Sequence, residues 1–88
     1  MDHSMDRKDV RQRRLLWRAS HRGIKEMDIL LGGFAAARVH GLSEQELDEL
    51  ETIVGLPDPE LLSWITGASP VPPKLRTATL EALLAYRP

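Results

Sequence analysis

The sequence predicts an all-α protein, a compact bundle of about five short helices in a single domain. Apolar residues recur every three or four positions in several stretches, which is the helical period. No stretch combines alternating apolar and polar residues with the β-branched residues typical of strands. A chain of 88 residues is also too short to divide into several hydrophobic cores. We therefore expect residues 1–88 to form one domain, with residues 1–6 as a frayed N-terminus.

The first two helices are expected on either side of a glycine. Residues 7–20 carry an apolar side among arginines, and Gly23 can adopt the left-handed conformation that ends many helices. A second helix is expected over residues 24–40, where apolar residues fall at helical spacing. Gly32-Gly33 lies in its middle, and each glycine weakens a helix by about 1 kcal/mol relative to alanine. We expect a kink or a division into two short helices at this point.

The third helix has the most distinct start. Ser43 and Glu46 have the spacing of a capping box, in which each side chain bonds the backbone N–H of the other residue. Leu42 is expected to pack on Leu47 as a hydrophobic staple, and Gly55 is expected to end the helix. The residues expected to face the core are Leu47, Leu50, Ile53 and Val54.

Two further helices are expected in the C-terminal third of the chain. Asp58 is interpreted as the N-cap of the fourth helix, with Pro59 at its first helical position. Trp64 lies among apolar residues of this helix and is interpreted as a core residue. The prolines of residues 67–73 predict a loop, and the last helix is expected over residues 73–86.

The net charge of −1 conceals a separation of charge along the chain. Two interpretations stay open: the two regions attract each other within the fold, or the basic surface steers an acidic partner. Between residues 7 and 25 the only acid is Asp9, and the bases are Arg7, Lys8, Arg11, Arg13, Arg14, Arg18, Arg22 and Lys25. Between residues 44 and 60 there is no base, and the acids are Glu44, Glu46, Asp48, Glu49, Glu51, Asp58 and Glu60.

Several classes of protein are disfavoured by residues that the sequence lacks. The absence of cysteine excludes disulfides, thiolate zinc sites and a cysteine nucleophile, and it is typical of a reducing compartment. No apolar run is long enough to span a bilayer, and the first residues are acidic and precede no apolar segment. We therefore expect a cytoplasmic protein that does not insert into membranes.

No independent catalytic site is visible in the sequence. His3, His21 and His40 do not have metal-ligand spacing, so no metal site is expected. The serines lack the context of a nucleophile elbow, and no glycine-rich loop follows a strand. We expect a protein that is not an enzyme and that holds no tightly bound cofactor.

One constellation stands out, at the junction of the first two helices: Arg22-Gly23-Ile24-Lys25-Glu26-Met27-Asp28. Arg22 offers a planar fork suited to carboxylates or carbonyls, and Gly23 lets another surface approach the backbone closely. Glu26 follows Arg22 by four positions, so the two side chains would meet if one helix were continuous there. The alternative is that Gly23 only caps the first helix and that the charges are solvated.

At these residues the sequence resembles the succinate dehydrogenase FAD-assembly factors, also known as flavinators of succinate dehydrogenase. The family signature is Arg-Gly-x-x-Glu, usually followed by x-Asp. Leu15-Leu16-Trp17 resembles the basic first helix of the family, and the segment from Leu42 to Glu46 resembles its next helix start. The segment from Asp58 to Ile65 is similar to the family's Asp-x-Glu/Asp-Leu-x-x-Trp pattern. The resemblance covers residues 15–67.

The sequence departs from the family pattern in two places. Gly32-Gly33 lies where relatives often carry a larger residue or proline, so the second helix is expected to be more mobile here. The chain after Trp64 is generic, and only its length and apolar spacing agree with the family.

The resemblance implies a five-helix bundle that acts as an assembly chaperone. It would bind the flavoprotein subunit of succinate dehydrogenase or fumarate reductase and promote the covalent attachment of FAD to that subunit. We expect a monomer, with weak self-association left open. Trp17 is equally compatible with a core position. The residues expected to bind the partner are Trp17, Arg18, Arg22, Gly23, Glu26, Met27 and Asp28.

Three alternative functions stay open at this point. The basic first helix is also compatible with a nucleic-acid-binding module, although the chain as a whole is not basic. A small regulatory or antitoxin-like interaction protein would have the same fold class. A direct carrier of FAD is the third alternative, and the lack of a phosphate-binding motif disfavours it.

Overall fold

The computed structural model describes the backbone of residues 4–88 and the side chains of residues 7–88. Every regular element in this part of the chain is helical, which confirms the all-α class. The first helix begins at Ser4, so residues 4–6 of the segment expected to be frayed are helical, and residues 1–3 lie outside the described part. The elements are α1 (Ser4–Ser20), α2 (Lys25–Arg38), the 3₁₀ helix η1 (Val39–Gly41), α3 (Glu44–Val54), α4 (Asp58–Ile65), the 3₁₀ helix η2 (Pro73–Leu75) and α5 (Ala78–Ala85).

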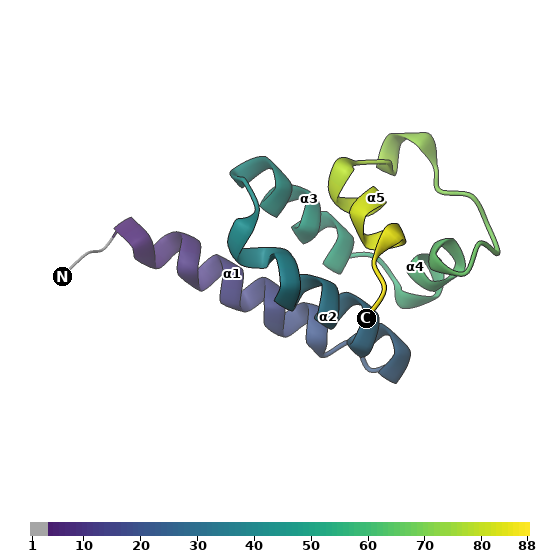
Figure 1. Ribbon diagram of the computed structural model, residues 1–88, viewed down its shortest axis with the longest axis horizontal. Coiled ribbons are helices and arrows are strands. Elements are labelled where there is room, and N and C mark those ends of the chain that lie inside the picture. Colours follow the sequence, from purple (N-terminus) through teal and green to yellow (C-terminus); the bar gives the residue numbers. More distant parts are fainter. Residues whose placement is uncertain (1–3) are drawn as a thin grey trace.

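The helices pack around one core beside a long helical hairpin. α1 and α2 run side by side and form the most extensive helix pair, and α3 packs against α1 and α5 (Figure 1). The N-terminal end of α1 extends past the rest of the bundle, whereas the loop between α1 and α2 lies at the opposite end of the hairpin (Figure 1). This arrangement brings the Arg-Gly turn, residues 21–24, close to the connection between α3 and α4.

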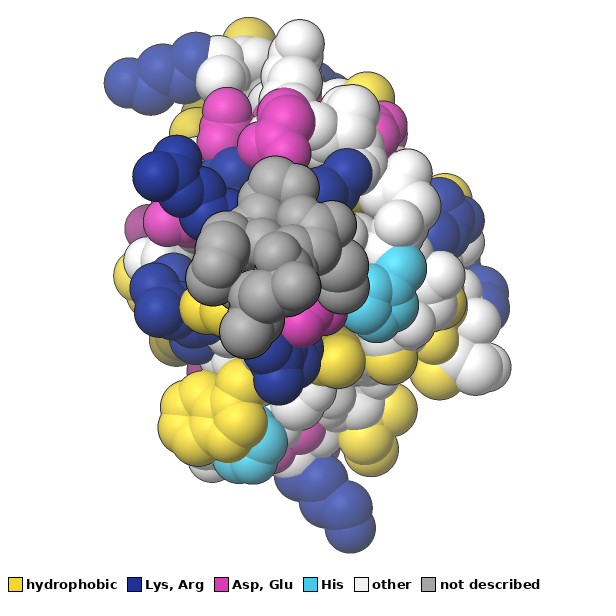
Figure 2. Space-filling view, turned by 90° about the vertical axis from the view of Figure 1, so that its left-hand side faces the viewer, with side chains coloured by type: hydrophobic (Ala, Val, Ile, Leu, Met, Phe, Trp, Pro, Cys, Tyr) yellow, Lys and Arg dark blue, Asp and Glu magenta, His cyan; other side chains and the backbone are white. Residues whose placement is uncertain are grey.

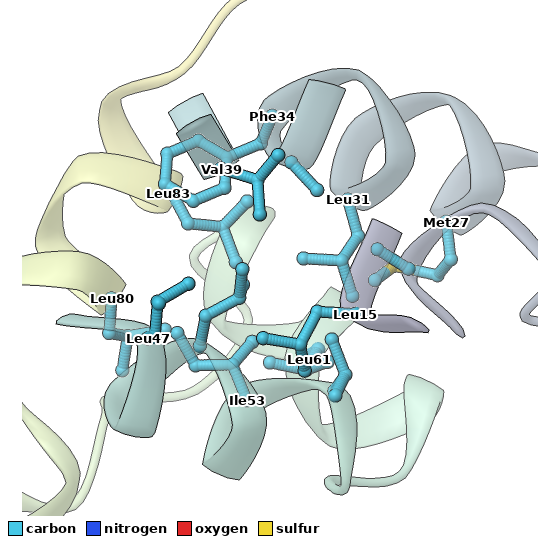
Figure 3. Close-up of a cluster of buried hydrophobic side chains, with 14 of the residues drawn as sticks. Leu15, Met27, Leu31, Phe34, Val39, Leu47, Ile53, Leu61, Leu80 and Leu83 are labelled. Carbon is cyan, nitrogen blue, oxygen red and sulfur yellow. The ribbon is translucent and has the colours of Figure 1, made fainter. Parts of the chain in front are cut away.

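The core draws on all five α-helices. Figure 3 shows its central side chains, which extend from α1 through α2 and α3 to α4 and α5. The four residues of α3 that were expected to face inward are all buried, and Trp64 is buried in α4, which confirms its core position. The largest fully buried side chains are Phe34, Leu15, Met27, Leu31, Leu47, Leu50, Leu61, Leu80 and Val39.

Gly32-Gly33 does not divide the second helix, so of the two expected outcomes, a kink or a division into two short helices, the division is wrong. A single α2 runs through both glycines. A Cβ atom on Gly32 would lie 2.9 Å from Oγ and 3.1 Å from Cα of Ser20, so the absent side chain lets α1 and α2 approach closely. A Cβ atom on Gly33 would lie 2.8 Å from the hydroxyl oxygen of Tyr86. Tertiary packing therefore offsets the low helix propensity of glycine.

The two glycines are expected to respond differently to alanine. In Gly32→Ala the new methyl group meets the Ser20 backbone, so we expect a loss of about 1–2 kcal/mol in the free energy of unfolding. In Gly33→Ala the obstacle is the far end of the Tyr86 side chain, which can move aside. The gain in helix propensity should then leave Gly33→Ala neutral or up to about 1 kcal/mol more stable. Urea unfolding would measure both, and equal destabilisation would contradict this account.

The helix ends explain where sequence and structure agree and differ. The capping box of α3 is present, since Ser43 N–H donates to Glu46 over 2.8 Å and Glu46 N–H donates to Ser43 over 3.1 Å. Asp58 is not the N-cap of α4; Pro57 holds that position, and the Asp58 carboxylate is used elsewhere. The second helix is two residues shorter than expected at its C-terminus, because residues 39–41 form η1.

The last helix is shorter than expected, because the segment from Pro73 contains two elements. η2 ends at Leu75, and α5 begins only after Thr77, whose hydroxyl accepts a hydrogen bond from Leu80 N–H over 3.1 Å. Glu49 of α3 also holds the start of α5, since its carboxylate accepts from the hydroxyl of Thr79 over 2.7 Å. This hydrogen bond lowers the pKa of Glu49. Side-chain caps therefore set the boundary of α5.

The separated charges meet within the fold. Arg11 of α1 donates to Asp48 over 2.5 Å and to Glu51 over 2.8 Å, and it lies 3.5 Å from Glu44. These hydrogen bonds, led by the one to Asp48, raise the pKa of Arg11. The intramolecular interpretation of the charge pattern is thus confirmed for Arg11, whose guanidinium is paired with carboxylates of α3. Figure 2 views the end of the molecule from which α1 extends and shows Lys and Arg side chains spread over this face, with acidic side chains among them.

Candidate protein-interaction site

The Arg-Gly turn occupies residues 21–24, between the end of α1 and the start of α2. Gly23 has φ of +92°, a conformation that L side chains rarely adopt. Its backbone is exposed, and a Cβ atom there would have nothing within 4 Å. Because α1 already ends at Ser20, Gly23 shapes the turn itself and does not directly cap the helix. The close approach expected at this glycine is therefore sterically open.

Arg22 turns inward instead of toward Glu26. Its Nε donates to Asp58 over 2.8 Å, Nη2 donates to the carbonyl oxygen of Leu56 over 2.6 Å, and Nη1 donates to the carbonyl oxygen of Val54. The expected meeting of Arg22 and Glu26 is wrong, because the chain between them is a turn and not a continuous helix. The side chains of Arg22 and Asp58 are only 9% and 10% exposed, so Arg22 is a structural group of the turn.

The other residues of the motif divide between the interior and the surface. Asp28 accepts a hydrogen bond from the backbone N–H of Arg22 over 2.5 Å, so it fixes the local geometry of the turn. Glu26 is exposed in the first turn of α2. Met27 is fully buried beside Leu31 (Figure 3), so its assignment to the partner-binding surface is wrong. The helical period places Met27 on the inner side of α2 and Glu26 on the outer side.

Trp17 lies on the surface close to this turn. It is 61% exposed, and its ring stacks on His21 with the ring centres 4.1 Å apart and the planes 11° apart. Nδ1 of His21 also donates to the carbonyl oxygen of Trp17 over 2.7 Å. A shallow hollow of about 200 Å³ is lined by Trp17, Arg18, His21 and Arg22. The structure therefore brings Trp17 and Arg18 to the Arg-Gly turn and excludes a core position for Trp17.

Sequence reasoning missed two residues of this site. Asp58 was interpreted as a cap, and no local signal connects it to Arg22, which lies 36 positions earlier. His21 was considered only as a metal ligand, although its position four residues after Trp17 predicts contact on one side of a helix end. Within the described residues, no three His, Asp or Glu side chains are grouped to hold a metal ion. No helix in that part of the chain is long and apolar enough to cross a membrane.

The chain is a small helical protein in which an exposed glycine turn lies next to an exposed tryptophan stacked on His21. This pair forms a candidate protein-interaction site, since tryptophan is enriched at interface hot spots. Comparison with known proteins gives the family. Residues 13–87 match the family described as flavinator of succinate dehydrogenase, and the chain belongs to that family. The match includes the C-terminal residues that looked generic in the sequence.

Individual relatives agree with this assignment. A FAD assembly factor of Acetobacter pasteurianus is 43% identical over 75 residues, which are 85% of this chain and 69% of the relative. The mitochondrial succinate dehydrogenase assembly factor 2 of Dictyostelium discoideum is 34% identical over 70 residues, 80% of this chain and 50% of that protein. Its counterpart in Debaryomyces hansenii is 35% identical over 79 residues, which are 86% of this chain and 56% of that protein. This chain thus spans about half the length of the mitochondrial relatives.

Proposed function

We propose that this protein binds the flavoprotein subunit of succinate dehydrogenase, or of fumarate reductase, and promotes the covalent attachment of FAD to that subunit. The observation that carries the proposal is the exposed Gly23 turn, placed beside Trp17 in a chain of the flavinator family. Its relatives are named as FAD assembly and succinate dehydrogenase assembly factors. In this proposal the protein acts in the cytoplasm as a monomer.

The proposed role is that of a chaperone and not of an enzyme. The groups that form the covalent bond belong to the flavoprotein subunit and to FAD. Bond formation depends on the alignment of the reacting atoms and on preorganised stabilisation of developing charge. A helper can supply alignment by holding the partner in its reactive arrangement. We further propose that this chain holds no FAD tightly by itself.

The surface that meets the partner consists, in this proposal, of Trp17, Arg18, Gly23 and Glu26. The turn offers backbone at Gly23 and a carboxylate at Glu26, whereas Trp17 offers a large apolar ring. Arg18 lines the same hollow as Trp17 and supplies positive charge. Arg22 and Asp28 lie beneath this surface and fix its conformation through their hydrogen bonds. The partner surface that fits it combines an apolar depression with acidic groups near Arg18 and a cation or backbone N–H near Glu26.

A flavin-attachment assay tests the proposal. Apo flavoprotein subunit and FAD are incubated with and without this protein, and covalent flavin is followed by in-gel fluorescence. We expect wild-type protein to accelerate labelling and Glu26→Ala to lower that acceleration about tenfold, as for the loss of one charged contact at an interface. Glu60→Ala is the matched control, because Glu60 is likewise exposed in the first turn of its helix.

The outcomes separate the candidate functions. No acceleration by wild-type protein, together with no co-purification of the two proteins, would overturn the assembly role. Equal losses in Glu26→Ala and Glu60→Ala would remove Glu26 from the proposed surface. Equilibrium dialysis of FAD against this protein alone distinguishes a carrier, since tight binding without the partner would contradict the chaperone role.

A further inference from the structure

We propose that Asp58 is a positioning residue for the partner-binding turn and that it acts through Arg22. This inference deepens the proposed function and depends on it. It joins two segments that are far apart in the sequence, the Arg-Gly turn and the start of α4, into one functional unit. Asp58 itself would not touch the partner.

Four hydrogen bonds hold Arg22 in place. Its guanidinium donates to three acceptors, namely Asp58 and the carbonyl oxygens of Val54 and Leu56, which lie between the last residue of α3 and the first residue of α4. Its backbone N–H donates to Asp28. Arg22 is therefore fixed through both its guanidinium group and its backbone. Because Gly23 is the next residue, its position depends on that of Arg22. These bonds therefore restrict movement of Gly23 relative to α2, α3 and α4.

The Arg22–Asp58 ion pair lies where the end of α3 meets the start of α4. Val54 is the last residue of α3, and the final carbonyl groups of a helix lack partners within the helix. The Arg22 guanidinium supplies donors there and complements the negative end of the α3 dipole. Asp58 lies in the first turn of α4, where a negative charge is favourable. One buried cation thus joins two helix ends, and loss of Asp58 would leave it without its counter-charge.

The Arg22–Asp58 ion pair is largely shielded from solvent. Side chains that are only 9% and 10% exposed cannot supply the main contacts to a partner. Another ion pair has the same arginine donor atom and the same distance but a different setting: Arg76 Nε lies 2.8 Å from Glu81, and these side chains are 48% and 51% exposed. Exposed ion pairs of this kind do little to fix the local conformation of the chain, because water and salt screen their charges. The Arg76–Glu81 pair is therefore a matched control for the Arg22–Asp58 pair.

The experiment uses the full chain and two readouts. Nuclear magnetic resonance of the ¹⁵N-labelled protein reports the amide of Gly23 and the Nε–H of Arg22 without any partner. Binding to the apo flavoprotein subunit is measured at a temperature where all variants are folded. For Asp58→Ala we expect a shifted Gly23 resonance, faster exchange of the Arg22 Nε–H, and affinity lowered about tenfold if the competent turn falls to about a tenth of the population.

Two further variants make the test specific. Asp58→Asn keeps an oxygen acceptor for Arg22 Nε but removes the counter-charge, so it is expected to recover only part of the Gly23 shift and of the affinity lost in Asp58→Ala. Arg22→Lys keeps the charge but cannot reach all three acceptors with one ammonium group, so it should behave like Asp58→Ala. It also serves as the test variant if Asp58→Ala does not fold. Glu81→Ala should leave both readouts unchanged.

The possible failures are distinguishable. If Asp58→Ala lowers affinity while the Gly23 resonance stays unchanged, Asp58 is a direct contact and the inference is overturned. Unchanged affinity in both Asp58→Ala and Arg22→Lys overturns it as well. If the wild-type protein does not bind the subunit, the proposed function fails and the positioning role fails with it. In that case the resonance measurements still show separately whether Asp58 orders the turn.

Discussion

Gly23→Arg is expected to remove the acceleration of flavin attachment, with a loss of about 100-fold or more, comparable to the loss of an interface hot spot. A Cβ atom at Gly23 meets nothing within 4 Å, so the folded protein has room for the new side chain. The arginine would instead project from the turn into the space that a partner must occupy. Because φ of +92° is unfavourable for L residues, the substitution also strains the backbone by roughly 1–2 kcal/mol. The flavin-attachment assay measures the loss, and thermal unfolding measures the strain.

Two variants separate obstruction from strain. Gly23→Ala carries the same backbone strain without the bulk, so we expect it to retain most of the activity. Gly41→Arg adds the same cation at another exposed glycine, which has open space around its Cβ position and no positive φ, and it should be fully active. If Gly23→Ala were as inactive as Gly23→Arg, the conformation of the turn and not its accessibility would control function. Full activity of a folded Gly23→Arg protein would remove this surface from the proposal.

Trp17→Ala is expected to weaken binding of the flavoprotein subunit by about 30- to 100-fold, the range of a tryptophan hot spot. The stack on His21 holds the exposed ring in place, so binding it requires little further ordering. Because the side chain is outside the core, its removal should change the free energy of unfolding by no more than about 0.5 kcal/mol. The expected result is therefore a large loss of affinity with unchanged stability. Isothermal titration calorimetry with the apo subunit measures the affinity, and urea unfolding measures the stability.

The controls for Trp17 lie on the same helix. Trp17→Phe retains an aromatic ring that can stack on His21, and it should recover a large part of the affinity. Val10 is another exposed apolar residue, seven positions earlier and on the same side of α1, so Val10→Ala tests whether the whole helix face contributes. Equal losses in Trp17→Ala and Val10→Ala would assign binding to the face of α1 and not to an anchor at the turn. A loss of stability in Trp17→Ala would show that the ring supports the fold.

Local signals predicted the helices well where the responsible atoms are close in sequence. The capping box of Ser43 and Glu46 bonds residues three positions apart, so its pattern is visible without tertiary structure. The inward side of α3 follows from helical period alone. By contrast, the continuity of α2 depends on Ser20, which α1 brings against Gly32. Helix propensity weighs only the local cost of glycine, and the compensating close packing cannot be read from the segment itself.

The candidate site shows the same difference between features set by local sequence and features set by tertiary packing. Sequence by itself determined the helical class, the family resemblance, the need for glycine in the turn and the candidate residues around it. Only the tertiary structure decided that Trp17 faces solvent and that Arg22 binds Asp58 and not Glu26. The physical reason is distance along the chain. A guanidinium carries several donors and can pair with any suitable acceptor, and only the packing of α1 and α2 against α3 and α4 selects one 36 positions away.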